Sequence, residues 1–378
     1  MMKNIAKQRK ILLLWNGMTS KQVSGGDIYI KQVVEHSKDS FDVIQSNHSK
    51  NLIESKNTQT VLNTGSSEPT SNIGIVLTYL KRGISSFFFV GKLQEKDNNY
   101  AFVLASSPFI CDLLPALRMK HAHRAVILFH LIPDRSAKSL SMKIRFALAK
   151  LEQKIALSII KKHFDSVLVG NSEVKAAVEK LMPGKKLIIA HAGIDTSAFP
   201  GKGVKKNPNL GLFIGRLTSQ KGVLDLVDIV ADILKKQPEF RLEIIGDGPH
   251  RHLLEEKMQL AGMKAITILG FVDNTIKYQK LAEATFFLFP SYEEGWGIAL
   301  AEGLYAECKS VCYELDHYQN IFGDYPTYVP IGDKAAFSKA VLTSYDHAPV
   351  KGQKKFIEQY DYAAVVTDVV SRISEDVE

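Results

Sequence analysis

Residues 285–302 read TFFLFPSYEEGWGIALAE: an apolar run, a turn with two glycines and then a helical pattern. The apolar run is typical of a buried strand. Glu294 lies at the junction of strand and helix, and Glu302 lies eight residues later, about two helical turns on. Because ligands of open α/β folds bind at the carboxyl ends of parallel strands, we expect both carboxylates to face one crevice there. The two glycines would let backbone N–H groups approach a ligand closely.

Short apolar runs alternate with helical patterns along most of the chain, which is typical of parallel sheets with crossover helices. The sequence therefore predicts an α/β fold class. Residues 46–72 are polar and are expected to hold helix pieces and loops, and residues 356–373 have a helical pattern. The expected strands are Ile11–Trp15, Phe41–Gln45, Phe87–Val90, Phe102–Ala105, Ala125–Phe129, Ser166–Val169, Leu187–Ala190, Leu210–Ile214, Arg241–Ile245, Ile266–Leu269, Phe286–Phe289, Ser310–Tyr313 and Thr327–Val329.

The composition is that of a soluble globular protein large enough for two domains, with 378 residues, of which 45% are hydrophobic and 23% charged. The polar stretch 200–209 (PGKGVKKNPN) has breakers at both ends and predicts a linker between two doubly wound domains. The three cysteines form no disulfide or metal pattern, which favours a reducing compartment. No apolar run approaches the roughly 20 residues of a membrane span, so we expect a cytoplasmic protein.

The net charge of +8 is concentrated in the first half, where residues 1–200 hold 28 Lys and Arg against 15 Asp and Glu. Residues 118–162 hold eleven Lys and Arg but only Asp134 and Glu152 as acids. Two interpretations of this segment stay open. It is either a peripheral contact with an anionic membrane surface, on the inner face of the membrane, or a core-packed helix with a solvated basic back.

A second candidate stretch is 215–222 (GRLTSQKG), which directly follows the first expected strand of the second half. Arg216 and Lys221 lie on one strand-to-helix loop, where both side chains could reach a diphosphate. Arginine offers a planar fork of donors and lysine a mobile point charge. Two solvated loop cations are the alternative, and the two glutamates downstream argue against it.

The Glu-Gly-Trp-Gly core with Glu302, preceded by GRL…KG, resembles the E-x7-E motif of retaining GT-B glycosyltransferases of family 4, the glycosyl transferases group 1. This resemblance implies two Rossmann-like doubly wound domains that face a central cleft. It implies an acceptor-side domain at 1–199, a linker at 200–209 and a nucleotide-sugar-binding domain at 210–355. A C-terminal helix, at about 356–378, would pack back on the first domain.

The resemblance also assigns roles to residues. Arg216 and Lys221 would hold the donor diphosphate, Glu294 the sugar hydroxyls and Glu302 the ribose hydroxyls. His130, after an expected strand, would lie near the donor sugar, with a structural histidine as the alternative. The further donor-binding residues implied are Gly25, Gly26, Gly215, Gly246, Gly270, Phe271, Val272, Gly295, Trp296, Gly297 and Ile298.

Cleavage of a glycosyl–diphosphate bond places positive charge on the sugar ring and negative charge on the leaving phosphate. Cationic side chains and glycine amides can stabilise that phosphate, so no metal or cofactor is expected, and no Asp-x-Asp follows an expected strand. The resemblance implies retention of configuration by front-face attack, with Glu294 not acting as a nucleophile.

The chain departs from the family pattern just after the E-x7-E motif. Trp296 stands where phenylalanine is commoner. The usual Ala-x-Ala-x-Gly-x-Pro-Val is replaced by residues 303–311, which lack that glycine and proline, and residues 315–323 stand in place of a Gly-Gly…Glu loop. These departures leave the identity of the donor open.

The function expected is transfer of a hexosyl unit from a UDP-sugar, or alternatively GDP-mannose, to a cell-surface glycan or lipid-linked acceptor. A nucleotide-sugar epimerase of the same fold and a non-catalytic binding subunit stay open as alternatives. Nucleic-acid binding ranks last, because the aromatic residues do not interleave with the basic residues on a stacking surface.

Overall fold

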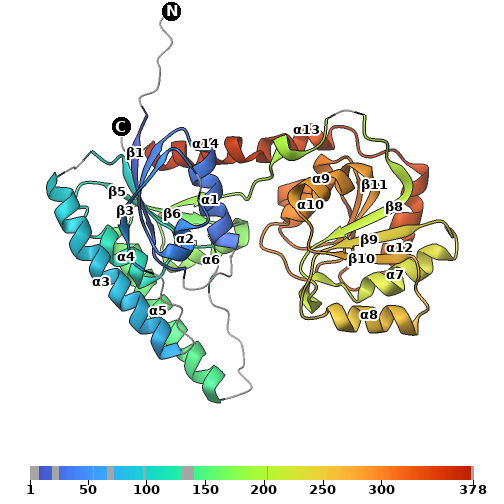
Figure 1. Ribbon diagram of the computed structural model, residues 1–378, viewed down its shortest axis with the longest axis horizontal. Coiled ribbons are helices and arrows are strands. Elements are labelled where there is room, and N and C mark those ends of the chain that lie inside the picture. The colour runs from blue at the N-terminus through green and yellow to red at the C-terminus, as the bar shows by residue number, and fades with distance from the viewer. Residues whose placement is uncertain are drawn as a thin grey trace, which may run out of the picture. The chain divides into compact units, whose positions relative to one another are not determined.

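The computed structural model describes residues 8–18, 25–53, 55–65, 72–96, 99–129, 131, 140–201 and 203–375. The chain divides into two compact units, one of Met1–His191 with Tyr362–Glu378 and the other of Ala192–Asp361. Each unit is built around a parallel sheet with helices on its faces (Figure 1). The predicted α/β class is confirmed.

The first unit contains a seven-stranded sheet with the order β3-β2-β1-β4-β5-β6-β7. The strand order reverses between β1 and β4, as in a doubly wound fold. Its strands are β1 (Lys10–Trp15), β2 (Ser40–Gln45), β3 (Thr58–Asn63), β4 (Phe102–Ala105), β5 (His123–Ile127), β6 (Ser166–Val169) and β7 (Lys186–Ile189). Its helices are α1 (Gly25–His36), α2 (Asn47–Lys50), α3 (Asn72–Lys96), α4 (Ile110–Ala116), α5 (Leu140–His163), α6 (Ser172–Leu181) and α14 (Tyr362–Ser374).

The two faces of this sheet form separate hydrophobic cores. On one face, β1 packs against α1 and α14, and buried valines of both helices join the same cluster. The last helix of the chain is therefore part of the first unit. On the other face, Val90 of α3, Leu113 of α4 and Ile160 of α5 cover the sheet.

The second unit contains a six-stranded parallel sheet with the order β10-β9-β8-β11-β12-β13, and its strand order reverses between β8 and β11. Its strands are β8 (Asn207–Ile214), β9 (Arg241–Ile245), β10 (Ile266–Gly270), β11 (Ala284–Phe289), β12 (Lys309–Tyr313) and β13 (Thr327–Val329). Its α-helices are α7 (Asp225–Leu234), α8 (Arg251–Leu260), α9 (Asn274–Glu283), α10 (Ile298–Tyr305), α11 (Tyr318–Phe322), α12 (Lys334–Thr343) and α13 (Gln353–Ile357), with short 3₁₀ turns at Thr196–Ala198, Ser219–Lys221, Ser344–Asp346 and Glu358–Tyr360.

Three predictions from the sequence pattern were wrong. The apolar run 87–90 was expected to be a strand but lies inside α3, because the periodicity of so short a run does not distinguish strand from helix. The polar stretch 46–72 contains the edge strand β3, whose partly exposed residues give no apolar signal. The expected linker 200–209 overlaps β8, which begins at Asn207, and the division between the units falls after His191.

Buried side chains hold the backbone that follows β1. Arg82 of α3, only 2% exposed, donates through Nη1 to the carbonyl oxygens of Asn16, at 2.8 Å, and Met18, at 2.7 Å. Asp112 of α4 accepts the Asn16 N–H through Oδ1 at 2.7 Å. The Ser46 hydroxyl donates to the same Met18 carbonyl at 3.0 Å. Helices α3 and α4 therefore position the start of the segment that leads from β1 to α1.

Asp112 makes the stability of the first unit depend on pH. Its carboxyl group is fully buried, and this burial raises its pKa to about 7 although the Ser106 and Ser107 hydroxyls donate to Oδ2. An unfolded aspartate has a pKa of about 3.9. The folded state therefore binds an extra proton between these values. The stability from this proton is present in full below about pH 4 and is lost as the pH rises through 7.

We expect Asp112→Asn to abolish this decline, because the amide keeps the acceptor for Asn16 without a titrating charge. Urea unfolding of the wild type and the variant at pH 5, 6, 7 and 8 measures the difference. The same decline in both proteins would assign it to another group.

Glu307 is a strained position in the second unit. Its φ of 57° lies in the left-handed region, at the position where the family pattern has glycine. We expect Glu307→Gly to raise the free energy of unfolding by about 0.5–1 kcal/mol. The control is Glu358→Gly, because Glu358 has an ordinary φ of −56° and its replacement should destabilise. Thermal unfolding measures both, and a lower melting temperature for Glu307→Gly would contradict the prediction.

Candidate functional site

The candidate residues of the second unit lie on four loops at one edge of its sheet. These loops follow the carboxyl ends of β8, β9, β10 and β11, beside the point where the strand order reverses. Arg216 and Lys221 lie on the first loop, and Glu294 lies on the fourth. The geometry therefore brings together side chains that are more than 70 residues apart in the chain.

Backbone hydrogen bonds join these loops. The N–H of Tyr292 donates to the Gln220 carbonyl at 2.8 Å, which ties the β11 loop to the β8 loop. The N–H of Leu217 donates to Asp247 at 3.0 Å, and the N–H of Gly246 donates to the Gly270 carbonyl at 2.8 Å. The loops therefore form one connected frame at the edge of the sheet.

Two glycines allow the loops to approach this closely. A Cβ on Gly246, whose φ is 135°, would lie 2.0 Å from the Gly215 carbonyl oxygen. A Cβ on Gly222, whose φ is 62°, would lie 1.9 Å from the Pro290 carbonyl oxygen. Any side chain at either position would push two loops of the site apart.

The Glu294 carboxylate already has partners in this frame. Lys221 Nζ lies 2.5 Å from Glu294 Oε1, and the Ser291 hydroxyl donates to the same oxygen at 3.0 Å. Lys221 therefore stabilises the charge of Glu294, and the two groups lie where one ligand can meet both. Neither was expected to pair with the other from the sequence.

Arg216 differs from Lys221 in having no carboxylate partner. Its side chain is exposed, and no ion pair or side-chain hydrogen bond of its guanidinium is found among the residues that the structure describes. A guanidinium at a strand end with its donors unoccupied fits an incoming anion.

Glu302 has partners that the sequence motifs did not indicate. It lies in α10 and is only 4% exposed. Its Oε1 is 2.6 Å from Lys277 Nζ and accepts a hydrogen bond from the Tyr278 hydroxyl at 3.3 Å. Both partners lie on α9, which follows the loop after β10, and no motif includes them. The available signal in the sequence was Lys277 itself, a lysine near the start of the helix that follows the expected base-recognition segment.

The donor-binding roles expected for the rest of the Glu-Gly-Trp-Gly core stay predictions. The Trp296 ring is buried and makes edge contacts with the rings of Phe322 and Tyr360, at centroid distances of 5.4 Å and 5.0 Å. Only its backbone is therefore available to a ligand. Gly297 has a φ of 99° and precedes the first residue of α10, Ile298, whose side chain is exposed.

The expected base-recognition segment is open to solvent. Gly270 ends β10 with a φ of 74°, and the Phe271 ring that follows is 90% exposed. Val272 is half-buried. A ring exposed to this extent beside the frame of loops can contact a planar ligand.

The candidate residues of the first unit are less completely described. Gly25 and Gly26 are the first two residues of α1, as expected for a glycine turn that opens a helix. His130 lies outside the described residues. Among those described, no three His, Cys, Asp or Glu side chains gather as a metal site, and metal independence stays a prediction.

Comparison of the sequence with models of protein families identifies the family of the second unit. The family model of the glycosyl transferases group 1 matches residues 195–360, which include all four loops. This segment belongs to the glycosyl transferases group 1. The predicted membership of the glycosyl transferases group 1 is confirmed for this segment, whereas family 4 and retention of configuration stay predictions.

Similar proteins agree with the assignment of this segment. CapH of Staphylococcus aureus, a capsular polysaccharide biosynthesis glycosyltransferase, is 29% identical over 246 residues, 63% of this chain and 66% of CapH. The alpha-monoglucosyldiacylglycerol synthase of Acholeplasma laidlawii is 30% identical over 123 residues, 32% of this chain and 29% of that protein. The chain matches between 25% and 66% of the length of the first curated relatives.

Solved structures of glycosyltransferases share the fold. The structure of HepE from Anabaena in complex with UDP has a TM-score of 0.72, covering 97% of this chain and 99% of HepE at 13% identity. A sucrose-phosphate synthase of Thermosynechococcus elongatus has a TM-score of 0.67 over 97% of this chain at 16% identity. This chain therefore has the GT-B fold, which the sequence resemblance predicted.

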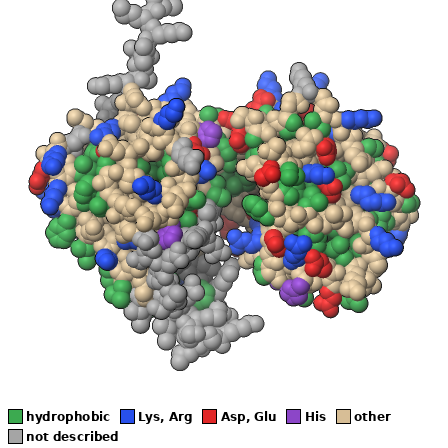
Figure 2. Space-filling model, in the orientation of Figure 1, with side chains coloured by type: hydrophobic (Ala, Val, Ile, Leu, Met, Phe, Trp, Pro, Cys, Tyr) green, Lys and Arg blue, Asp and Glu red, His purple; other side chains and the backbone are tan. Residues whose placement is uncertain are grey.

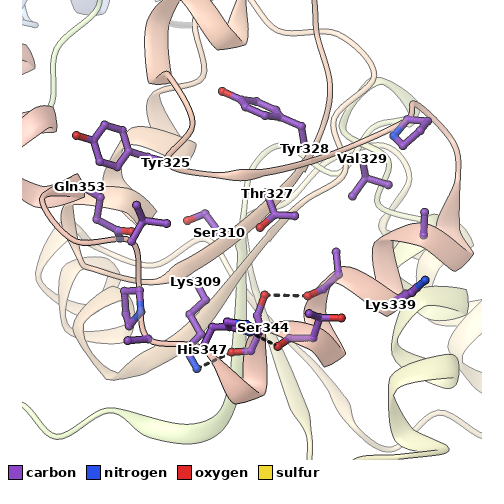
Figure 3. A pocket seen from close by; sticks show the side chains of 17 residues that line it. Lys309, Ser310, Tyr325, Thr327, Tyr328, Val329, Lys339, Ser344, His347 and Gln353 are labelled. Carbon is purple, nitrogen blue, oxygen red and sulfur yellow. Dashed lines mark hydrogen bonds between the residues drawn. The ribbon is translucent and has the colours of Figure 1, made fainter.

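A cavity of about 530 Å³ lies elsewhere in the group 1 domain. Figure 3 shows Lys309 and Ser310, which begin β12, and Thr327, which begins β13, among its lining residues. Lys309 Nζ donates to the Ser344 carbonyl at 2.7 Å on one wall. The cavity therefore lies at the amino ends of these strands, opposite the loops that carry Arg216 and Glu294.

Proposed function

We propose that this chain is a retaining glycosyltransferase that moves a hexosyl unit from a nucleoside diphosphate sugar to a glycan or lipid-linked acceptor. The single observation that supports this most is the frame of loops in which Glu294 and Lys221 are paired, with the exposed Arg216 on the same loop as Lys221. A carboxylate for sugar hydroxyls and a cation for a diphosphate are the groups that this reaction needs at one place.

In this mechanism Arg216 and Lys221 hold the diphosphate and stabilise the charge that forms as the glycosyl bond breaks. Glu294 binds hydroxyls of the transferred sugar and supports the positive charge of the ring. Glu302 accepts hydrogen bonds from the hydroxyls of the ribose, and Lys277 holds the Glu302 carboxylate in place. We propose that the reaction is metal-independent and that the acceptor attacks from the face of the leaving group, which retains the configuration.

For the donor we propose a UDP-sugar, with GDP-mannose as the alternative. Support comes from HepE, a structural neighbour that was crystallised with UDP. The acceptor class is supported by CapH, named for capsular polysaccharide, and by the synthase of Acholeplasma laidlawii, named for a glucosyl lipid. Assembly of such glycans from nucleotide sugars would place this protein in the cytoplasm.

Calorimetric titration of UDP and GDP tests the donor assignment. UDP is expected to bind, and Arg216→Ala should weaken it at least about tenfold through loss of charge-assisted hydrogen bonds. The matched control is Arg241→Ala, because Arg241 is exposed at the opposite, amino end of β9. Binding of neither nucleotide, or equal losses in both variants, would contradict the proposal.

A further inference from the structure

The outward face of α3 carries a row of large apolar side chains. Val76, Leu77, Leu80, Ile84 and Phe88 are 45%, 60%, 43%, 53% and 65% exposed. Their spacings of three and four residues place Leu77, Leu80, Ile84 and Phe88 on one side of the helix, over about 17 Å. In Figure 2, apolar side chains reach the surface along the edge of the first unit where Figure 1 places α3.

The inward face of the same helix is partly polar. Gly83 faces α4, where a Cβ on it would lie 3.2 Å from the Cα of Cys111. Arg82 and Ser86 are buried beside it. Over three helical turns, α3 therefore exposes Leu, Ile and Phe to solvent and buries Arg, Gly and Ser. Packing within the unit does not account for this distribution, and exposed apolar patches of this kind mark interaction surfaces.

The charges on this face favour an anionic partner. Lys81 lies four residues after Leu77, and Lys92 lies four residues after Phe88, so both lysines extend the apolar row. Both are exposed, and residues 72–94 contain no Asp or Glu. Two copies of this face would place lysines against lysines, whereas an anionic lipid surface would neutralise them.

We propose that the outward face of α3 docks on an anionic lipid bilayer, with the helix in the plane of the membrane. Leu77, Ile84 and Phe88 enter the boundary between headgroups and acyl chains, and Lys81 and Lys92 contact lipid phosphates. None of the helices in the described ranges is long and apolar enough to cross a membrane, which agrees with in-plane contact.

Helix α5 exposes the same combination of apolar and basic side chains. Like α3, it packs against α4, and it exposes Leu148, Leu151 and Ile155 together with Lys150 and Lys154. The sequence had suggested a membrane contact only for the basic segment 118–162. The structure adds α3, with its row of exposed large apolar residues. The proposal goes beyond the proposed function, since it concerns the surface on which the protein works and not the donor.

Co-sedimentation of the full chain with vesicles tests the proposal. One set of vesicles is phosphatidylcholine alone, and the other contains about a third phosphatidylglycerol. We expect binding to the anionic vesicles that weakens at high salt. Leu77→Ser with Phe88→Ser should reduce the partition coefficient at least about tenfold. The matched control is Leu260→Ser, at an exposed leucine on α8 of the other unit, and it should bind as the wild type does.

Two further variants separate the contributions. Lys81→Glu with Lys92→Glu should remove most of the preference for anionic vesicles. In Phe88→Trp, the fluorescence of the introduced tryptophan should shift to shorter wavelength on binding, and brominated acyl chains should quench it.

Failure of the wild type to bind, or equal binding by Leu77→Ser with Phe88→Ser, would overturn the proposal. Self-association that these two changes abolish, seen by sedimentation velocity, would assign the face to a second copy instead. UDP titration of every variant reports on the second unit, so loss of lipid binding with UDP binding retained separates this proposal from the proposed function.

Discussion

Replacing Glu294 with alanine is expected to lower kcat/KM for sugar transfer by about 30- to 1000-fold, a loss of about 2–4 kcal/mol of transition-state stabilisation. Lys221 and Ser291 hold the Glu294 carboxylate at 2.5 Å and 3.0 Å, so its charge is in place before a sugar arrives. UDP affinity should be retained, because Arg216 and Lys221 are still present to contact the diphosphate. Initial rates and calorimetry measure the two effects separately.

The control is Glu293→Ala, which removes the same functional group from an exposed neighbour and should leave turnover near the wild-type value. Glu294→Gln tests the charge, since glutamine keeps the shape and the hydrogen-bonding oxygen. We expect it to recover only a small part of the rate. Near wild-type turnover in Glu294→Ala would remove Glu294 from the mechanism.

Arg82→Met is expected to lower the free energy of unfolding of the first unit by about 2–4 kcal/mol. The Asn16 and Met18 carbonyls would lose their guanidinium donor, although Met18 would keep the hydrogen bond from the Ser46 hydroxyl. Burial lowers the pKa of Arg82, because it disfavours the charged guanidinium. The two hydrogen bonds and the nearby Asp112 favour that charge and keep it in the interior. The loss should therefore exceed that of a surface arginine.

The fluorescence of Trp15 during unfolding measures this loss, because Trp15 is buried at the end of β1, next to Asn16. The chain has two tryptophans, so a Trp296→Phe background leaves Trp15 as the single reporter in the first unit. Lys81→Met, at the exposed neighbour on α3, should change stability by less than about 0.5 kcal/mol. Equal stability of Arg82→Met and Lys81→Met would show that the carbonyls find other donors.

Local patterns predicted much of the fold. Both sheets follow from apolar runs between helical patterns, because a strand that is buried on both faces must be apolar along its length. The stretch 285–302 predicted β11 to within two residues, and it predicted that a glycine turn and a helix, α10, follow this strand. Arg216, Lys221 and Glu294 were expected at one edge of the sheet, because each follows the end of a parallel strand and such ends share an edge.

Other features have no local signal. The edge strand β3 is half exposed and polar, so its pairing with β2 is what makes it a strand. The apolar run 87–90 belongs to a helix because α3 packs along α4, a contact between residues about 30 positions apart. His130 lies outside the described residues, so its expected place near the donor sugar stays a prediction.

The order of apolar runs, turns and helical patterns was therefore enough to establish two doubly wound α/β units and the edge on which the reactive groups of the second unit lie, because these properties depend on neighbours along the chain. Tertiary packing decided which groups pair. Lys277 meets Glu302 and Arg82 meets the backbone after β1, because elements distant in sequence approach one another in the folded units. The same packing leaves Leu77, Leu80 and Phe88 of α3 exposed to solvent. Such contacts depend on the distances between elements, which no periodicity in the sequence encodes.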